Sequence, residues 1–308
     1  MISTLERFQG CLVGLAVGDA MGAAVEFKER GTFPPVTYYQ AGGPFNLLAG
    51  QWTDDTSMAL CLAASLIEKR GFDPVDQLKR YLRWFREGYL SSTGFCFDIG
   101  NTTQASLEDF ENTGAAYRLE PDETTGSNGS IMRLAPVPMF FYRKAQLAVE
   151  QSANSSRTTH PARDAVDACR YLACLISAAL SGADKSSLLV PFCAPAENYW
   201  LEQPLSTAIQ SVANADYRHK DASAIHGDGL AAHCLEAALW AFDHTSDFAS
   251  GCLLAINLGE DTDTTAAVYG QIAGAFYGLQ GIPLAWREGL FEFDKIAQTA
   301  ADLLDLAV

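Results

Sequence analysis

The amino-acid sequence predicts an all-α protein, folded as one compact domain of many helices over residues 1–308, and three observations support this prediction. Long runs rich in Ala, Leu and Met contain no interior proline, and polar residues recur in most of them at helical spacing. Strand-like material is scarce, and Pro35–Gln40 is its best candidate. No repeat, flexible linker or alternation of strands with helices divides the chain. We therefore expect one core packed between helices.

The expected helices are of two kinds. Some runs are apolar almost all round, which is typical of helices buried on every side: residues 56–69, 163–180, 229–242 and 264–279. Others are amphipathic: residues 75–87, 103–112, 144–155, 205–213 and 293–306. Loops next to these helices combine glycine with hydroxyl, amide and acidic residues, so we expect functional groups in residues 18–26, 49–56, 95–103, 125–136 and 257–265.

The composition argues against several classes of protein. The chain has 21 Lys and Arg against 37 Asp and Glu, a net charge of −16, and no basic stripe, so no nucleic-acid partner is expected. The apolar stretch 10–25 contains Asp19 and four glycines, which predicts neither a signal peptide nor a membrane span. The eight cysteines form no Cys-x-x-Cys pair, which favours free thiols in a reducing cytoplasm.

Two acidic clusters, far apart in the sequence, are the strongest indication of function. Residues 53–56 are Thr-Asp-Asp-Thr and residues 261–265 are Asp-Thr-Asp-Thr-Thr. Carboxylate and hydroxyl oxygens are the ligands that Mg²⁺ and Mn²⁺ prefer. Carboxylates brought together repel one another unless a cation neutralises them. The clusters therefore predict a site for one or two divalent cations at helix N-termini; the alternative is that each is a helix N-cap.

A glycine-serine loop predicts an anion site. Residues 125–130 are Thr-Gly-Ser-Asn-Gly-Ser, and glycines followed by free backbone N–H groups suit a pyrophosphate. An ordinary turn is the alternative. Arg133 could pair with an acid or with a phosphate, and His160 could be a capping or core residue or contact a ligand. No His-x-x-x-His pair, Gly-x-Ser-x-Gly elbow, Walker loop or Rossmann fingerprint occurs.

Six motifs, taken in order, resemble those of the ADP-ribosylglycohydrolases, with the bacterial dinitrogenase-reductase-activating glycohydrolases as the nearest branch. They are GCLVGLAVGDAMGAAVEF (10–27), WTDDTSMAL (52–60), FDIGNTT (97–103), GSNGSIMRLAP (126–136), TH (159–160) and NLGEDTDTTAAVYGQIAGAFYG (257–278). The resemblance covers nearly the whole chain. It implies an all-α fold, a centre of two Mg²⁺ or Mn²⁺ ions, and cleavage of the bond between ADP-ribose and a protein side chain.

The resemblance also implies roles for individual residues. The implied metal ligands are Thr53, Asp54, Asp55, Asp261, Asp263 and Thr264. The implied substrate-binding residues are Ser127, Asn128, Gly129 and Ser130 for the phosphates, Met132, and His160 near the adenosine ribose. The implied catalytic residues are Asp98, Glu26 and Asp55.

Two of these positions, and Glu260 beside them, carry further expectations. Asp98 resembles the acid that faces the target side chain in arginine-directed bacterial enzymes, although it could instead cap the following helix. Glu26 matches a family glutamate that touches the metal region and can lie on a mobile loop. Glu260 departs from the family, where many members have glycine, and it would either tune metal affinity or face solvent.

The leading hypothesis is a cytoplasmic, dimetal-dependent hydrolase that removes ADP-ribose from arginine side chains of a modified protein and releases ADP-ribose as product. One alternative keeps the metals but acts on serine-linked ADP-ribose or small ADP-ribose esters. Another is a catalytically silent binding or structural relative, which the intact acidic residues argue against. The sequence leaves open the protein substrate, the choice between Mg²⁺ and Mn²⁺, the oligomeric state, and which of Asp98 and Glu26 transfers the proton.

Overall fold

Two central helices, α1 (Thr4–Gly22) and α13 (Thr262–Tyr277), organise the fold of this protein, whose computed structural model describes residues 2–117 and 126–308. Fifteen α-helices occur in these residues, where the only β-pairing is three isolated bridges. One continuous cluster of buried side chains joins the helices. The prediction of an all-α fold is confirmed.

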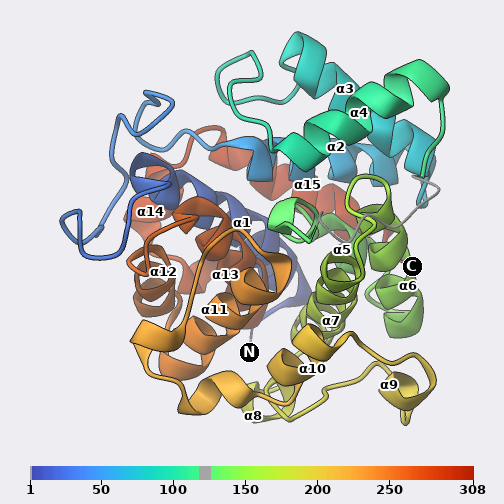
Figure 1. Cartoon of the computed structure of the whole chain (residues 1–308), viewed down its shortest axis with the longest axis vertical. Coiled ribbons are helices and arrows are strands. Elements are labelled where there is room, and N and C mark those ends of the chain that lie inside the picture. Colours follow the sequence, from blue (N-terminus) through green and yellow to red (C-terminus); the bar gives the residue numbers. More distant parts are fainter. Residues whose placement is uncertain (1, 118–125) are drawn as a thin grey trace.

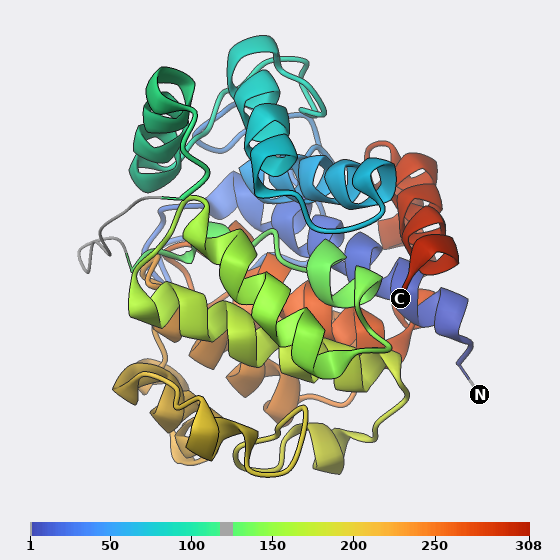
Figure 2. The ribbon, with the colours of Figure 1, turned by 90° about the vertical axis from the view of Figure 1, so that its right-hand side faces the viewer.

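The other helices surround this central pair (Figures 1 and 2). They are α2 (Asp54–Lys69), α3 (Pro74–Glu87), α4 (Asn101–Thr113), α5 (Pro136–Phe140), α6 (Ala145–Arg157), α7 (Arg163–Leu180), α8 (Lys185–Leu188), α9 (Tyr199–Glu202), α10 (Thr207–Ala213), α11 (Ala231–His244), α12 (Phe248–Ile256), α14 (Leu284–Gly289) and α15 (Phe293–Leu306). Helices α2, α3 and α4 lie at one end of the molecule, and α8, α9 and α10 lie at the other (Figure 1).

Glycines allow α1 and α13 to pack backbone against backbone. Glycine occupies every fourth position of α1 from 10 to 22 and so forms a stripe along one face. A Cβ added at Gly14 would lie under 3.0 Å from the carbonyl oxygen of Gly270, and one added at Gly18 would meet Ala266 in the same way. Because the two helices run antiparallel, the end of α1 lies against the start of α13.

The first helix has a composition that also suits a membrane. By length and apolar content the segment Thr4–Val25 could cross a bilayer, yet 94% of its most apolar window is buried inside the protein. Such burial is what the core helix of a folded domain shows.

Several boundaries differ from the sequence prediction. Residues 18–26, predicted as a loop, continue α1 to Gly22 and then form the 3₁₀ turn Ala23–Val25. The candidate strand Pro35–Gln40 has no strand structure. Helix α11 begins at Ala231 rather than at residue 229, because the two preceding residues pair with the glycine-serine loop.

Six helices were not predicted: the long α1, the nine-residue α12, and the short α5, α8, α9 and α14. In α1 the apolar residues surround the helix and glycines interrupt them, so neither an amphipathic pattern nor helix propensity reveals it. The contact with α13 stabilises it instead.

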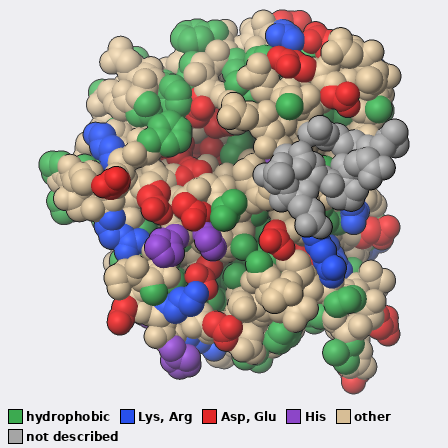
Figure 3. Space-filling view, in the orientation of Figure 1, with side chains coloured by type: hydrophobic (Ala, Val, Ile, Leu, Met, Phe, Trp, Pro, Cys, Tyr) green, Lys and Arg blue, Asp and Glu red, His purple; other side chains and the backbone are tan. Residues whose placement is uncertain are grey.

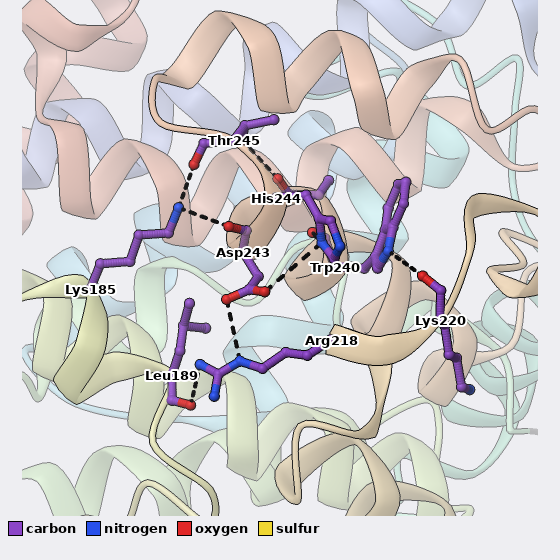
Figure 4. Close-up of polar contacts among 9 residues, drawn as sticks. Lys185, Leu189, Arg218, Lys220, Trp240, Asp243, His244 and Thr245 are labelled. Atoms are coloured by element: carbon purple, nitrogen blue, oxygen red, sulfur yellow. Dashed lines mark hydrogen bonds and ion pairs between the residues drawn. The ribbon is translucent and has the colours of Figure 1, made fainter.

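A polar network holds the C-terminal end of α11 (Figure 4). The Lys185 ammonium donates to the backbone carbonyl oxygens of Thr245 and Asp243, where the helix dipole favours a cation. Arg218 donates to the Asp243 carboxylate at 3.3 Å and to the Leu189 carbonyl at 2.7 Å. The network thus anchors the far end of the helix whose start meets the glycine-serine loop.

Candidate active site

The two acidic clusters meet in the folded protein. The first turns of α2 and α13 carry Asp55 and Asp263, and both carboxylates are buried. The Thr53 hydroxyl lies 3.3 Å from Asp55 Oδ2 and 3.2 Å from Asp263 Oδ2. The Thr264 hydroxyl lies 3.4 Å from Asp55 Oδ2. Hydroxyl and carboxylate oxygens from both ends of the chain therefore share one buried site.

The clusters do not serve as helix caps. Thr53 is the N-cap residue of α2 and Asp261 that of α13, yet neither side chain accepts a hydrogen bond from its own first turn. An ordinary cap occurs at α12, where Asp247 Oδ1 accepts from the Ser250 backbone N–H at 2.8 Å. The N-cap alternative therefore does not explain the acidic clusters.

Asp19, which the sequence analysis did not single out as a site residue, caps α2 from another helix. It is fully buried on α1. Its Oδ1 accepts from the backbone N–H and hydroxyl of Thr53 at 2.8 and 2.9 Å. Its Oδ2 accepts from the backbone N–H and hydroxyl of Thr56 at 2.9 and 2.6 Å. One carboxylate thus satisfies free N–H groups of α2 and positions its acidic first turn. The sequence feature that could have identified Asp19 is its position as an acidic residue within an otherwise apolar run.

Two groups of carboxylates are close enough to share a cation. One oxygen each from Asp19, Asp55 and Asp263 lies within 4.8 Å of the others, and the same holds for Glu26, Asp261 and Asp263. Three buried oxygens, Oδ1 of Asp55, Oδ1 of Asp263 and Oε2 of Glu26, have no hydrogen-bond partner among the residues that the structure describes. Buried polar atoms without partners are costly, so this donor set fits a divalent cation.

Without a cation, these carboxyl groups resist ionisation. Burial raises the pKa of Asp55 and of Asp263 well above the usual range, and neighbouring carboxylates raise it further. Burial, followed by the charges of Asp263 and Asp98, raises the pKa of Glu26 to about 12. A bound cation would favour the ionised forms, because its charge opposes both effects.

The acidic site opens into a cleft of about 400 Å³. Figure 3 shows acidic side chains in a hollow of this face, with hydrophobic side chains at its edge. The predicted site residues that line the cleft are Glu26, Asp54, Asp98, Ser127, Asn128, Gly129, Met132, His160, Asp261, Asp263 and Thr264. Thr53 and Asp55 lie behind this lining. Two larger hollows, of about 540 and 450 Å³, contain none of these residues.

Asp54 faces Asp98 rather than the two carboxylate groups. When its carboxyl group is protonated, Asp54 donates a hydrogen bond to the Asp98 carboxylate. Burial raises the pKa of Asp98 to about 6, although the bond to Asp54 opposes this rise. The N-cap residue of α4 is Gly100, and no side chain caps that helix. Asp98 is therefore not the helix cap that was considered as its alternative role.

The glycine-serine loop forms another wall of the cleft. The Asn128 backbone N–H donates to the Gly229 carbonyl at 2.9 Å, and its side chain donates to Asp261 Oδ2 at 2.8 Å. The loop is thus joined directly to the acidic site. Ser130 was expected to contact the substrate phosphates, but its side chain does not line the cleft. Its hydroxyl is buried behind the loop and accepts a hydrogen bond from the Ser156 hydroxyl at 2.8 Å.

Arg133 and His160 support this loop. The buried Arg133 donates to the Gly129 carbonyl at 2.7 Å and to the Thr159 hydroxyl at 2.5 Å, and it stacks over the Tyr81 ring at 4.6 Å. It forms no ion pair with an acid in the described residues, so its charge lies uncompensated beneath the loop. Burial lowers the pKa of His160 well below its usual value, which keeps this cleft residue neutral.

Glu260 has a structural role that neither expectation anticipated. Its φ of 66° is uncommon for a residue other than glycine. Its backbone pairs with Lys28, and its Oε2 accepts from the Gly227 backbone N–H at 2.8 Å. The carboxylate therefore holds a neighbouring loop, outside both carboxylate groups.

Comparisons with known proteins place the chain in a family. A model of the ADP-ribosylglycohydrolase family matches residues 1–308. The chain belongs to the ADP-ribosylglycohydrolase family. The family prediction made from the motifs is confirmed.

Individual members of the ADP-ribosylglycohydrolase family match nearly the whole chain. ADP-ribosylarginine hydrolase Tri1 of Pseudomonas putida is 40% identical, over 98% of this chain and 79% of the relative. ADP-ribosyl-[dinitrogen reductase] glycohydrolase of Rhodospirillum rubrum is 28% identical, over 92% of this chain and 90% of the relative. A solved structure described as an ADP-ribosylglycohydrolase-related protein complex is 42% identical, with a TM-score of 0.86 and 99% of both chains covered.

Removing divalent cations from this ADP-ribosylglycohydrolase should make its stability fall as pH rises. Burial raises the pKa of Asp19 and of Asp98 to about 6 and that of Glu26 to about 12, whereas unfolded carboxyl groups titrate near about 4. Above about pH 4 the folded state binds more protons than the unfolded state, so the free energy of unfolding falls with pH.

In EDTA we expect a Tm at least about 5 °C lower at pH 8 than at pH 5, and excess Mg²⁺ should remove most of this difference. Scanning calorimetry at both pH values measures the effect. A Tm in EDTA that does not change between these pH values would contradict it.

Proposed function

We propose that this chain is a hydrolase that uses two Mg²⁺ or Mn²⁺ ions to remove ADP-ribose from a modified arginine side chain of a protein. Two relatives named ADP-ribosylarginine hydrolase, 37–40% identical over almost the whole chain, support the arginine linkage. The observation that carries the proposal is the set of unpartnered buried oxygens on Asp55, Asp263 and Glu26, next to a cleft with an amide-rich loop. Divalent cations on the carboxylates would contact the ribose hydroxyls of ADP-ribose, and the loop would contact its diphosphate.

The acidic clusters would hold the cations. The proposed ligands are the carboxylates of Asp55, Asp261 and Asp263 and the hydroxyls of Thr53 and Thr264. Asp54, which the family resemblance also implied, would join them by turning from Asp98 toward the cations. Two ions rather than one are proposed because Asp263 belongs to both groups of carboxylates. Bound there, divalent cations would supply Lewis-acid chemistry that orients ribose hydroxyls and activates water.

The glycine-serine loop would hold the diphosphate. Backbone N–H groups next to glycine can approach phosphate oxygens closely. Arg133 contributes a positive charge beneath the loop, in a protein whose net charge is −16. Since Arg133 is buried and donates to the Gly129 carbonyl, it acts by positioning the loop and through its field rather than by contact.

Asp98 and Glu26 would handle the leaving group and the water. Cleavage at the anomeric carbon develops positive charge on the ribose, which the acidic lining of the cleft stabilises. Asp98 can accept two parallel hydrogen bonds from a planar guanidinium. Glu26, which lies in one of the carboxylate groups, would take the proton of the attacking water.

The decisive experiment measures release of free ADP-ribose from proteins modified on arginine or on serine, with Mg²⁺, with Mn²⁺ and with EDTA. We expect metal-dependent release from the arginine-linked substrate. Faster release from the serine-linked substrate would overturn the assigned linkage, and full activity in EDTA would overturn the metal requirement. A cytoplasmic location and a single domain over residues 1–308 remain predictions.

Replacing Asp98 by asparagine should slow hydrolysis of ADP-ribosyl-arginine at least about a hundredfold, the usual size of an acid–base contribution. Asparagine has nearly the same shape but cannot match the guanidinium charge. Affinity for free ADP-ribose, measured by calorimetry, should be unchanged because that ligand lacks the guanidinium. A variant with normal turnover would remove Asp98 from the proposed mechanism.

Replacing Gly129 by valine should weaken ADP-ribose binding about tenfold. A Cβ at this position would lie 2.8 Å from His160 Cε1 and 3.4 Å from the Thr103 hydroxyl, so it would fill the space where the loop meets the cleft. Gly126 is the matched control, because a Cβ there meets nothing within 4 Å. Calorimetry with ADP-ribose should separate Gly129→Val from Gly126→Val; equal affinities would show that the loop is only a turn.

A further inference from the structure

A row of four phenylalanine side chains lies along the edge of the cleft. The ring centroids of Phe27 and Phe45 are 6.4 Å apart, those of Phe45 and Phe97 5.3 Å, and those of Phe97 and Phe95 6.1 Å. Phe27 is 66% exposed and Phe95 is 60% exposed, while the two rings between them are half-buried. Contiguous exposed aromatic rings are uncommon on a protein surface and mark contact sites.

The phenylalanine row is continuous with the catalytic groups. Phe27 follows Glu26 in the sequence and lines the cleft itself. Phe97 precedes Asp98, the residue assigned to the guanidinium. Two members of the row are therefore next in sequence to the carboxylates assigned to the water and to the guanidinium, and the row ends in the exposed rings of Phe27 and Phe95.

The exposure of Phe27 is imposed by its backbone. Its φ of 64° is an uncommon conformation for a bulky residue. The Phe27 N–H donates to the Glu260 carbonyl at 2.8 Å, and the Glu260 N–H donates to the Lys28 carbonyl at 2.7 Å. These bonds hold the ring in an exposed position that burial of apolar surface would not favour. Strain of this kind is retained most often at functional sites.

The row faces an acidic cleft, which limits the kind of partner. Asp54, Asp98 and Asp228 line this cleft together with Phe27. Carboxylates next to aromatic faces suit a segment that carries cationic and apolar side chains, since guanidinium groups stack on aromatic rings. The backbone that bears a modified arginine must also leave the cleft over its edge. Both arguments indicate a polypeptide.

We propose that the row Phe27–Phe45–Phe97–Phe95 binds the polypeptide segment flanking the ADP-ribosylated arginine. This inference rests on the proposed function. The row should increase the affinity for a modified protein, because the polypeptide extends beyond the cleft and contacts the rings. Free ADP-ribosyl-arginine ends within the cleft and gains nothing from them.

Two substrates with the same scissile bond test this. One is free ADP-ribosyl-arginine, and the other is a protein carrying ADP-ribose on a single arginine. The test variant is the double substitution Phe45→Ala and Phe95→Ala, since neither residue lies next to Asp98 or Glu26 in the sequence. Leu201→Ala is the control, because Leu201 is 81% exposed and lines a different hollow.

The double variant should raise KM for the modified protein at least about tenfold, with little change in kcat, as loss of uniform binding does. Its kcat/KM for ADP-ribosyl-arginine should stay within about twofold of the unmodified enzyme. Leu201→Ala should leave KM and kcat unchanged for both substrates.

Three results would overturn the proposal. An equal loss on both substrates would mean that the rings only support the loop bearing Asp98. An unchanged KM for the protein would mean that the row does not contact it. A change in oligomeric state, measured by sedimentation, would identify the row as a contact between copies. If the unmodified enzyme cleaves neither substrate, the proposed function itself fails.

Discussion

Replacing Asp263 by asparagine should abolish turnover and, at the same time, stabilise the metal-free protein. Asp263 is the one carboxylate shared by both groups that could hold a cation, and one of its buried oxygens has no partner in the described residues. Loss of a shared anionic ligand should reduce kcat by at least about a thousandfold, as removal of a strong electrostatic contribution does.

The stability change has the opposite sign from that of an ordinary core substitution. Burial and the charges of Asp55 and Asp261 raise the pKa of Asp263, so its ionised form is disfavoured without a cation. At neutral pH the metal-free protein must therefore either protonate Asp263 or hold it ionised beside other carboxylates, and both cost free energy. A neutral amide of the same shape avoids this cost, so Tm in EDTA should rise at neutral pH. The stabilisation by added Mg²⁺ should shrink in the variant, because the cation loses a ligand.

Asp247→Ala is the matched control for this prediction. Asp247 also precedes a helix, but its carboxylate caps α12. Its loss should cost about 1 kcal/mol of stability and leave turnover unchanged. Thermal melts with and without EDTA, together with the release assay, compare the two variants. An Asp263→Asn enzyme that retains activity, or that melts at a lower temperature in EDTA, would contradict the proposed metal site.

Replacing Gly14 by alanine should destabilise the protein severely, although alanine is the better helix former by about 1 kcal/mol. The added Cβ would overlap the Gly270 carbonyl group of α13, and that backbone cannot move without separating the two central helices. Overpacking against backbone should outweigh the gain in propensity, with a net loss of at least about 3 kcal/mol.

The sign of the effect makes this test decisive. Helix propensity alone predicts a stabilised variant, whereas packing predicts a Tm lower by at least about 6 °C or a failure to fold. Gly71→Ala is the control, because a Cβ at Gly71 meets nothing within 4 Å. Calorimetry of both variants decides between the two effects. A Gly14→Ala protein as stable as the control would mean that the helices are not in close contact.

The helical periodicity of the sequence was sufficient where a helix has a polar face. Helices α3, α4, α6 and α15 lie within a few residues of their predicted positions. It was insufficient for α1, which is apolar on all sides and rich in glycine. The stability of that helix comes from a partner about 250 residues away in sequence, which no local pattern can reveal.

The roles of individual site residues could likewise be predicted from the sequence only in part. The types and order of the acidic residues predicted cation chemistry, but Asp54 and Asp55 lie on different sides of α2, because successive helical residues point about 100° apart. Asp55 faces the carboxylates of α13, whereas Asp54 faces Asp98. Likewise, Ser127 lines the cleft and Ser130 lies behind it.

The sequence by itself determined the helical class of the fold and the family, and it predicted which residues would supply oxygen ligands to a cation and which loop would hold phosphates. Only the tertiary structure decided which of those oxygens accept hydrogen bonds from the protein and which have no hydrogen-bond partner in the described chain. Asp19 is satisfied by Thr53 and Thr56, while Asp55 and Asp263 keep oxygens without a partner in the described chain. The physical reason is that hydrogen bonding and burial are properties of pairs distant in sequence, and the close packing of α1 on α13 is what brings those pairs together.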